Sequence, residues 1–199
     1  LLAPARAAVS EQQRVNGSAY RFVEAAQVLK EGKASWQDPE ALALIEAAIL
    51  RYELLGRLRA FVQTELTHAA AKGVWVAFGG QADVTDASDE GVTVAPGRIV
   101  AWAKVPPDQM LRLVTATVSR STADTNTKSL LFLASAVFCK EISGGVDLAL
   151  KFRERAVSLN STLLSLSERV LGGTPDVILA QSRIQAIRPE LARLAAAAA

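Results

Sequence analysis

The chain has 199 residues, a length that suits one domain or two small ones. Half of the residues are hydrophobic, which is ordinary for a globular protein, and the low aromatic content of 6% favours close-packed helices over a β-sandwich. Lys and Arg number 22 and Asp and Glu 20, so the formal net charge of +2 gives no strong field to attract a polyanion such as nucleic acid. One Cys and one His leave almost no means of building a zinc site, a disulfide framework or a Cys–His catalytic pair within the chain.

The two ends carry weak signals. Ala5-Arg6-Ala7 resembles the small-residue end of a signal peptide, which weakly suggests an extracytoplasmic compartment. The basic region, most of the apolar region and an initiator Met are missing, so we expect instead that the numbering begins inside a longer chain, at the start of a helix. No apolar run is long enough to predict a transmembrane helix. Localisation stays open between cytoplasmic and extracytoplasmic, and the final "LARLAAAAA" carries no functional indication.

Two helices are predicted in the first part of the chain. Residues 10–31 have apolar positions at helical spacing; Gly17 weakens this helix locally and Gly32 ends it. Asp38 and Pro39 form a strong helix start, and an unbroken apolar stripe then predicts one helix of about 30 residues over 39–72. We expect the two helices to pack as an antiparallel hairpin.

The period then changes to that of strands. Residues 74–78, 82–87, 92–95 and 98–105 predict four short strands in an antiparallel meander, with "SDEG" and Pro96-Gly97 as turns. In the first strand Val74, Val76 and Phe78 share one face and Trp75 the other. The expected core residues of this β module are Trp75, Val92, Val94, Ile99 and Trp102, although alternation does not decide which Trp faces inward.

Helical signals return after the strands. Pro106-Pro107 ends the last strand and Pro107 can open a helix over "DQMLRLVTATV". Residues 119–129 are polar and predict a flexible linker. Further helices are predicted over 130–142, 146–159, 160–171 and 176–194. The fold class is therefore mainly α (α+β): antiparallel helical hairpins with one small four-stranded antiparallel β module inserted, divided as 1–72, 73–107 and 108–199.

Residues 130–161 resemble one degenerate tetratricopeptide-type helical repeat. Small residues lie where the two helices of such a repeat touch, at Ala134 and Ala136 in the first helix and Ala149 and Ala156 in the second, and Gly144-Gly145 makes the turn. The usual closing Pro is replaced by Ser161, and the first-helix aromatic is out of register by about one residue. A single repeat cannot bury its own faces, so we expect the 39–72 helix and the 175–198 segment to cover it.

Residues 74–114 have a second resemblance. They are similar to small SH3-like or Sm-like β modules of large bacterial multidomain proteins, in which a turn like "SDEGVTV" and a closing V-W-x-x-L-P-P are followed by tetratricopeptide-like helices. Such modules are often joined to serine/threonine kinase or other regulatory domains. Lys104-Val105 departs from this pattern, and the kinase motifs are missing from the sequence. The resemblance therefore implies an accessory domain and no catalytic residue.

Several segments invite a chemical interpretation and are better explained by structure. "AFGGQAD" (77–83) lacks the Gly-Lys-Ser/Thr ending of a phosphate loop and predicts a hairpin turn. Asp83, Asp86, Asp89 and Glu90 could suggest Ca²⁺, but their spacing is not that of an EF-hand, and a solvated turn is the preferred interpretation.

The remaining reactive or charged residues are interpreted in the same way. His68 is expected on the surface near a helix end, with Glu65 three positions away on an exposed face rather than as a catalytic partner. Cys139 lies in an apolar stretch and is expected to be a small buried hydrophobe. "RLR" (57–59) and "KFRER" (151–155) are expected to be solvated helical faces. We assign no catalytic, cofactor-binding or metal-binding residue, and no cofactor.

Three classes of function remain. The first is a non-catalytic protein-interaction or scaffold module, with other protein subunits or domains as partners, because helical repeats form grooves that bind peptides. The alternative is nucleic-acid binding by the Sm-like module, for which only Arg98, Lys104 and one outward Trp are available. The third, an enzyme, has no supporting constellation. We also expect the apolar face of the 39–72 helix to meet the C-terminal helices or another chain.

Overall fold

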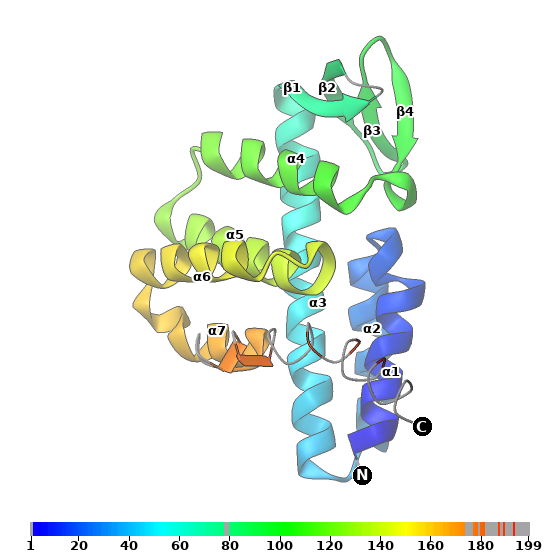
Figure 1. Ribbon diagram of the computed structural model, residues 1–199, viewed down its shortest axis with the longest axis vertical. Helices are drawn as coiled ribbons and strands as arrows, with labels where there is room; N and C mark the ends of the chain where they lie inside the picture. Colours follow the sequence, from blue (N-terminus) through cyan, green and yellow to red (C-terminus); the bar gives the residue numbers. More distant parts are fainter. Residues whose placement is uncertain are drawn as a thin grey trace.

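The computed structural model describes residues 2–77 and 80–173, together with residues 177, 178, 180, 181, 187, 189 and 193. It confirms a mainly α (α+β) fold of helices around one four-stranded antiparallel sheet (Figure 1). The helices are α1 (Leu2–Val15), α2 (Phe22–Gly32), α3 (Pro39–His68), α4 (Pro107–Arg120), α5 (Thr125–Phe138), α6 (Val146–Leu159) and α7 (Leu164–Leu171). The strands are β1 (Ala71–Ala77), β2 (Gly80–Ala87), β3 (Gly91–Val94) and β4 (Arg98–Ala101).

Helix α3 is the central support of the molecule. Its 30 residues start as predicted, with the Asp38 side chain accepting a hydrogen bond from the Ala41 amide at 2.9 Å and Pro39 in the first turn. Helices α1 and α2 pack on one side of α3, α5 and α7 on the other, and the sheet lies at its C-terminal end (Figure 1). The helix ends at His68, four residues before the predicted end, because the chain turns there into β1.

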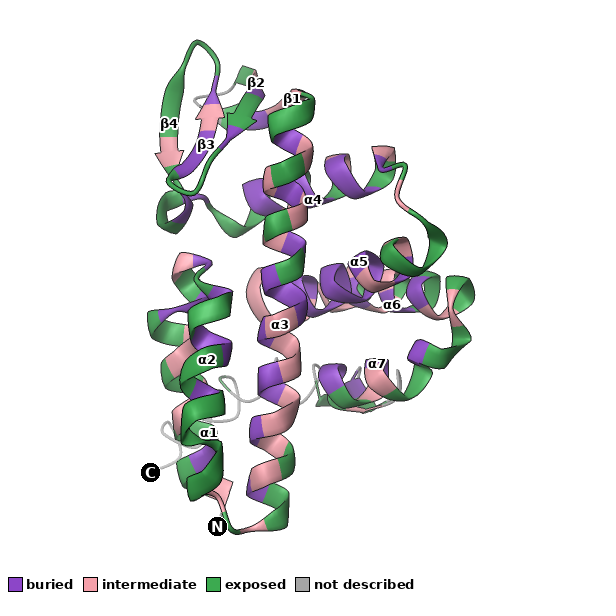
Figure 2. Ribbon diagram, turned by 180° about the vertical axis from the view of Figure 1, so that it is seen from behind, coloured by how far each residue is buried: buried purple, intermediate pink, exposed green. Residues whose placement is uncertain are grey.

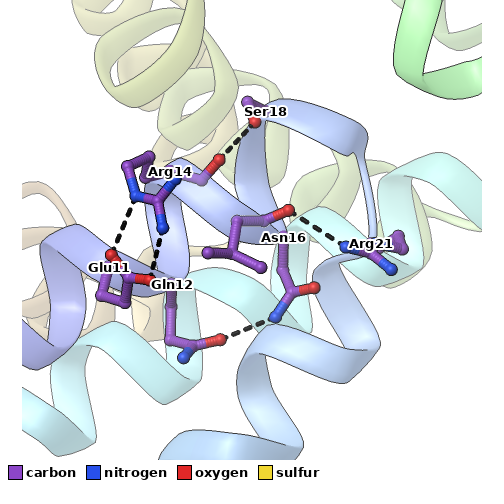
Figure 3. A network of polar contacts seen from close by, with 7 residues as sticks. Glu11, Gln12, Arg14, Asn16, Ser18 and Arg21 are labelled. Atoms are coloured by element: carbon purple, nitrogen blue, oxygen red, sulfur yellow. Dashed lines mark hydrogen bonds and ion pairs between the residues drawn. The ribbon is translucent and has the colours of Figure 1, made fainter.

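The predicted α2–α3 hairpin is present, but the single helix over 10–31 is wrong. The chain breaks between Val15 and Phe22, where Tyr20 has φ +57°. Figure 3 shows the polar contacts of this corner: Ser18 Oγ donates to the Arg14 carbonyl at 2.7 Å and Arg21 Nη2 donates to the Val15 carbonyl at 3.2 Å. These side chains satisfy carbonyls that a continuing helix would have used.

The break has a tertiary cause. Tyr20 is buried, and its hydroxyl donates to the Val105 carbonyl at 3.0 Å, 85 residues further along the chain. Its ring stacks on that of Phe138, with ring centroids 6.3 Å apart. The left-handed backbone of Tyr20 therefore directs its side chain into the core. There it contacts α5 through Phe138 and the segment after β4 through Val105.

The sheet has the predicted meander order, β1-β2-β3-β4, with every neighbouring pair antiparallel. Two boundaries differ from the prediction by three or more residues, and others differ by one or two. Strand β1 begins at Ala71 rather than at 74, because Gly73 (φ +62°) allows an irregularity in the pairing that keeps Ala71 opposite Val84. Strand β4 ends at Ala101, and Trp102–Lys104 form a 3-10 turn instead of continuing to residue 105.

The expected core of the sheet is correct at four positions and wrong at one. Trp75, Val92, Val94 and Trp102 are buried, so both Trp residues face inward, whereas Ile99 is 57% exposed. Ile99 pairs with Thr93, on the outer face, while Val100 pairs with Val92 and faces the core. Of the residues predicted to lie opposite Trp75, Val74 is half-buried, Val76 is exposed, and Phe78 lies outside the described residues.

Helix α4 begins as predicted, with Pro107 in its first turn, whereas the helix predicted to begin at residue 130 begins at Thr125. The linker predicted over 119–129 is wrong for most of its length, because α4 extends to Arg120 and α5 starts at Thr125. The Arg120 guanidinium donates to the carbonyls of Glu65 and Ala70, at 3.1 and 2.9 Å, beside the C-terminus of α3. This arginine thereby joins the end of α4 to the end of α3.

Helices α5 and α6 form an antiparallel pair. Gly144, with φ +73°, ends the π turn Cys139–Ser143 that follows α5. Ala149 and Ala156 are buried on α6, and Phe132 of α5 stacks on Phe152 of α6 with ring centroids 6.1 Å apart. The predicted 160–171 helix is present as a 3-10 turn, Ser161–Leu163, followed by α7. The predicted 175–198 and 176–194 segments lie largely outside the described residues.

The apolar face of α3 is covered by this chain. Figure 2 shows buried residues distributed around the helix, and α5 and α7 pack against it. Of the two possibilities expected from the sequence, contact with the C-terminal helices or with another chain, the structure shows contact with the C-terminal helices. Among the described residues, the large hydrophobic side chains that remain exposed lie outside α3; they include Val23 and Val28 of α2, Val76 of β1 and Ile99 of β4.

Candidate functional site

The turn between β2 and β3 is fixed to α3 by three side chains of that helix. Arg59 Nη2 donates to the Asp89 carbonyl at 3.3 Å, Gln63 Nε2 donates to Asp89 Oδ1 at 3.1 Å, and Thr67 Oγ1 donates to the Ala87 carbonyl at 3.0 Å. Residues 59, 63 and 67 are four apart, so they lie along one face of the helix. The sheet is therefore held in a defined orientation on the helical framework.

Trp102 holds the same turn from the other side. Its indole Nε1 donates to the Ser88 carbonyl at 2.9 Å, and the guanidinium carbon of Arg59 lies 4.9 Å from the ring centroid, in cation–π contact. Arg59 therefore contacts both the turn and the tryptophan that supports it. These contacts correct the interpretation of "RLR" as a solvated face, since only Arg57 of its two arginines is exposed.

The acidic cluster has structural contacts of its own. Asp83 Oδ1 accepts a hydrogen bond from the Gly73 amide at 2.8 Å, at the irregularity of β1, and Asp89 is held by Gln63. Asp86 accepts from the amide of Ala87, and Glu90 is exposed in the turn. In the part of the chain that the structure describes, no three His, Cys, Asp or Glu side chains lie close enough together to hold a metal ion.

The outer edge of β1 is closed by Gln109, a residue that the sequence analysis did not single out. The buried Gln109 amide pairs with both backbone groups of Val76: its Oε1 accepts from the Val76 amide at 3.0 Å, and its Nε2 donates to the Val76 carbonyl at 3.3 Å. The side chain thus replaces a neighbouring strand at this position. The feature of the sequence that could have indicated this role is a Gln in the first turn of the helix that follows Pro106-Pro107.

The edge of β4 is open. A groove of about 750 Å³ runs between this strand and the side of the sheet formed by β1 and the start of α4. Its lining includes Trp75 and Val76 of β1, Asp108 and Gln109 of α4, and Val94, Pro96, Arg98, Ile99, Val100, Ala101 and Lys104. Consecutive residues of β4 line it, so the groove follows the strand edge as well as one face of the sheet. Figure 2 shows that β4 is mostly exposed. The exposed Ile99 side chain is the largest apolar group of β4.

A second hollow continues from the end of β4 toward the helical hairpin. It measures about 600 Å³ and lies between the 3-10 turn and the α1–α2 corner, with Tyr20, Arg21, Glu24, Arg59 and Trp102 in its lining. Both hollows are lined by Glu90 and Ala101, so they adjoin along one surface. We call this combined surface the β4 groove.

The charges around the β4 groove are mixed. Arg98 and Lys104 are exposed, and neither forms an ion pair with another residue within the described ranges. Glu90 and Asp108 also line the groove. The outward Trp on which the nucleic-acid alternative depended is not provided by Trp75 or Trp102, because both are buried. The groove thus offers an apolar strip with separate charges rather than a basic surface.

A smaller and more enclosed cavity of about 220 Å³ lies between α1, α3 and the π turn after α5. Four of its polar residues form two pairs: Arg51 Nη1 lies 3.1 Å from Glu141 Oε1, and the Tyr52 hydroxyl donates to Gln13 Oε1 at 3.2 Å. Burial raises the pKa of Tyr52 to about 12, against a smaller lowering by Arg51. At neutral pH this phenol stays protonated, so it is a poor base.

The two rare reactive residues lie where the sequence predicted. Cys139 is fully buried, and burial raises the pKa of its thiol to about 11, which disfavours the reactive thiolate. His68 is exposed in the last turn of α3, with Nδ1 2.7 Å from the Thr64 carbonyl.

The "KFRER" stretch of α6 is the expected solvated face only in part, because Lys151, Glu154 and Arg155 are exposed but Arg153 is buried. Arg153 is only 8% exposed and lies 3.7 Å from Glu168 of α7, and Arg155 lies over the ring of Phe132 of α5. These arginines therefore connect α6 to its neighbouring helices.

Comparison with protein-family models, curated proteins and solved structures gives no match to this chain. Among the described residues no helix is both long and apolar enough to span a membrane. The candidate site is therefore defined by geometry alone: the β4 groove, an open strand edge on a rigid support.

Proposed function

We propose that the chain is a non-catalytic protein-interaction module, in which tetratricopeptide-like helices support a small SH3-like or Sm-like sheet as an accessory part of a larger bacterial protein or assembly. The observation that carries the proposal is the contrast between the two edges of the sheet. Gln109 pairs with the backbone of Val76 at the edge of β1, whereas within the described ranges no side chain pairs with the backbone of Ile99 or Ala101 in β4, and the groove between the two strands is bordered by the exposed Ile99. An uncovered strand beside an apolar groove is a common site for binding a peptide.

The rigidity of the support favours this proposal. Arg59, Gln63 and Thr67 fix the β2–β3 turn to α3, and Tyr20 ties the α1–α2 corner to the segment after β4. A binding surface that is ordered before the partner arrives loses less conformational entropy on association. Such a framework suits a scaffold, which presents one surface in a constant orientation.

The pairing, protonation and burial of the polar residues in the enclosed cavity support a non-catalytic role. The enclosed cavity holds an Arg51–Glu141 ion pair and a Tyr52 whose raised pKa keeps it protonated, and the Cys139 thiol is buried. A catalytic acid or base needs a pKa near the working pH and access to a substrate. Nucleic-acid binding, the alternative, is less well supported, because the two aromatic residues best placed for stacking on bases are buried.

The proposal is tested by affinity capture of the tagged chain at its natural abundance. The native chain is compared with Ile99→Asp, which alters the β4 groove, and with Val28→Asp, a matched control at a 46% exposed position of α2. We expect one or more proteins to be enriched with the native chain and with Val28→Asp but lost with Ile99→Asp. Equal recovery from all three variants, or no enrichment above an untagged control, would overturn the proposal.

A further inference from the structure

The hydrogen bonds of the sheet determine which backbone groups of β4 face outward. The Trp102 amide donates to the Glu90 carbonyl at 3.3 Å, which continues the β3–β4 register by one pair. Hydrogen-bonded and non-hydrogen-bonded pairs alternate along an antiparallel ladder. The pairs Val92–Val100 and Val94–Arg98 are therefore the bonded ones, and the N–H and C=O groups of Ile99 and Ala101 point away from β3, toward the open edge.

These outward groups form a template for another strand. Within the described ranges, neither Ile99 nor Ala101 has a side-chain hydrogen bond to its backbone like the one that Gln109 gives Val76. Building on the proposed function, we propose that β4 pairs with an extended segment of a partner protein, which joins the sheet as a fifth antiparallel strand. The partner segment carries apolar side chains beside Ile99 and Ala101 and an acidic side chain beside Arg98.

Charge disfavours a second copy of this chain as the occupant. If two β4 strands pair antiparallel about Ile99, the two Arg98 side chains become diagonal neighbours on one face of the sheet. Moving the centre of pairing to Ala101 brings Arg98 of each copy toward Lys104 of the other. Like charges at neighbouring cross-strand positions are destabilising and opposite charges are favourable. The exposed Arg98, which forms no ion pair within the described ranges, thus favours a partner strand with a carboxylate.

The β4 groove also provides the contact area that a short strand lacks. Four residues of β4 span only about 13 Å at the usual rise per residue, which gives a partner few backbone hydrogen bonds. The hollow lined by Tyr20, Arg21 and Glu24 begins where β4 ends. An extended segment can continue from the strand edge into this hollow and contact both the sheet and the α1–α2 corner.

The test uses synthetic ten-residue peptides of alternating Val and Glu, or of alternating Val and Lys, titrated into the complete chain. We expect the Val-Glu peptide to bind several-fold more tightly than the Val-Lys peptide, and the order to reverse with Arg98→Glu. Ile99→Pro, which removes an outward N–H, should weaken binding about tenfold or more. Ile99→Thr keeps that N–H and serves as its matched control.

Two measurements test the geometry on the unaltered chain. In an antiparallel bonded pair the side chains lie on one face, so the Val amides of the peptide should point toward β4. N-methylation of the Val amides should therefore abolish binding, and N-methylation of the Glu amides should leave it. Hydrogen exchange at Ile99 and Ala101 should slow when the peptide binds.

Several outcomes would overturn the inference. One is equal binding of the two N-methylated peptides, and another is binding that Ile99→Pro leaves unchanged. A dimer in sedimentation that Ile99→Pro dissociates would assign the edge to a second copy. Binding of an oligothymidylate that depends on Arg98 and Lys104 but not on the Ile99 amide would assign it to nucleic acid. If affinity capture finds partners that also bind the Ile99→Pro variant, the proposed function stands, but the proposal that a partner adds a strand to β4 is contradicted.

Discussion

Replacement of Trp102 by alanine should destabilise the sheet and its attachment to α3. The indole is 4% exposed, donates to the Ser88 carbonyl at 2.9 Å and supports the Arg59 guanidinium. Truncation leaves a cavity beneath the β2–β3 turn and removes the hydrogen-bond partner of the Ser88 carbonyl.

The size of the effect follows from these contacts. Truncation of a large buried aromatic side chain costs about 3–5 kcal/mol, including the cavity that it leaves. Trp102→Phe is the matched control, because it keeps most of the apolar contact and loses the indole N–H. Its expected cost is smaller, about 1 kcal/mol, which corresponds to the loss of one hydrogen bond to the carbonyl of Ser88, an exposed residue.

Urea unfolding followed by far-UV and near-UV circular dichroism measures both variants. In Trp102→Ala the near-UV signal of the tryptophans should be lost at lower urea than the far-UV helical signal, because the damage is local to the sheet. If Trp102→Ala is as stable as the native chain, or less perturbed than Trp102→Phe, Trp102 does not support the turn and its assignment to the core is wrong.

Three further substitutions test separate contacts. Ala149→Leu should cost about 1–3 kcal/mol in urea unfolding by overpacking the α5–α6 contact, and a neutral result would contradict the tetratricopeptide-like register. Gln109→Leu leaves both backbone groups of Val76 unpaired, so light scattering should detect association through the reopened β1 edge; a monomeric variant would contradict the role of Gln109. Hydrogen bonds from Thr127 hold the pKa of Asp124 below its usual range, so its contribution to stability is present above the unfolded pKa of about 4 and is lost as pH falls through the lower folded pKa. The stability difference between the native chain and Asp124→Asn should shrink over that acid range, and a difference that stays constant would contradict this linkage.

The elements that the sequence predicted well are those with local start and stop signals. Asp38-Pro39 opens α3, Pro107 opens α4, and Gly144 ends the segment after α5, and each acts on neighbouring backbone groups. Such signals need no knowledge of the rest of the chain. The fold class and the meander order could therefore be predicted before the structure was known.

The corner between α1 and α2 shows why other boundaries could not be predicted. Apolar spacing continues through residues 16–21, so a helix through this segment is locally reasonable. The break is decided by Tyr20, whose hydroxyl bonds to Val105 and whose ring packs on Phe138. Both partners are more than 80 residues away in the sequence, and local periodicity carries no information about them.

Ile99 illustrates a limit of a different kind. Strand β4 has four residues, and alternation over so short a stretch fits either face of the sheet. Only the register, with Val100 opposite Val92, decides that Ile99 faces outward. The residue predicted for the core is consequently the most exposed large apolar residue of the candidate site.

The asymmetry of the sheet edges has a simple origin in the order of the chain. Pro106-Pro107 ends the strand segment and starts α4, which packs against β1 at the opposite edge of the sheet. Helix α4 starts after β4 and runs across to β1, which it covers, and Gln109 in its first turn pairs with the backbone of Val76. The same dipeptide that stops the last strand thus closes one edge and leaves the other open. The open edge is therefore a consequence of topology. The exposed Ile99 and Arg98 on it give that edge an apolar and a charged group for the partner strand that we propose.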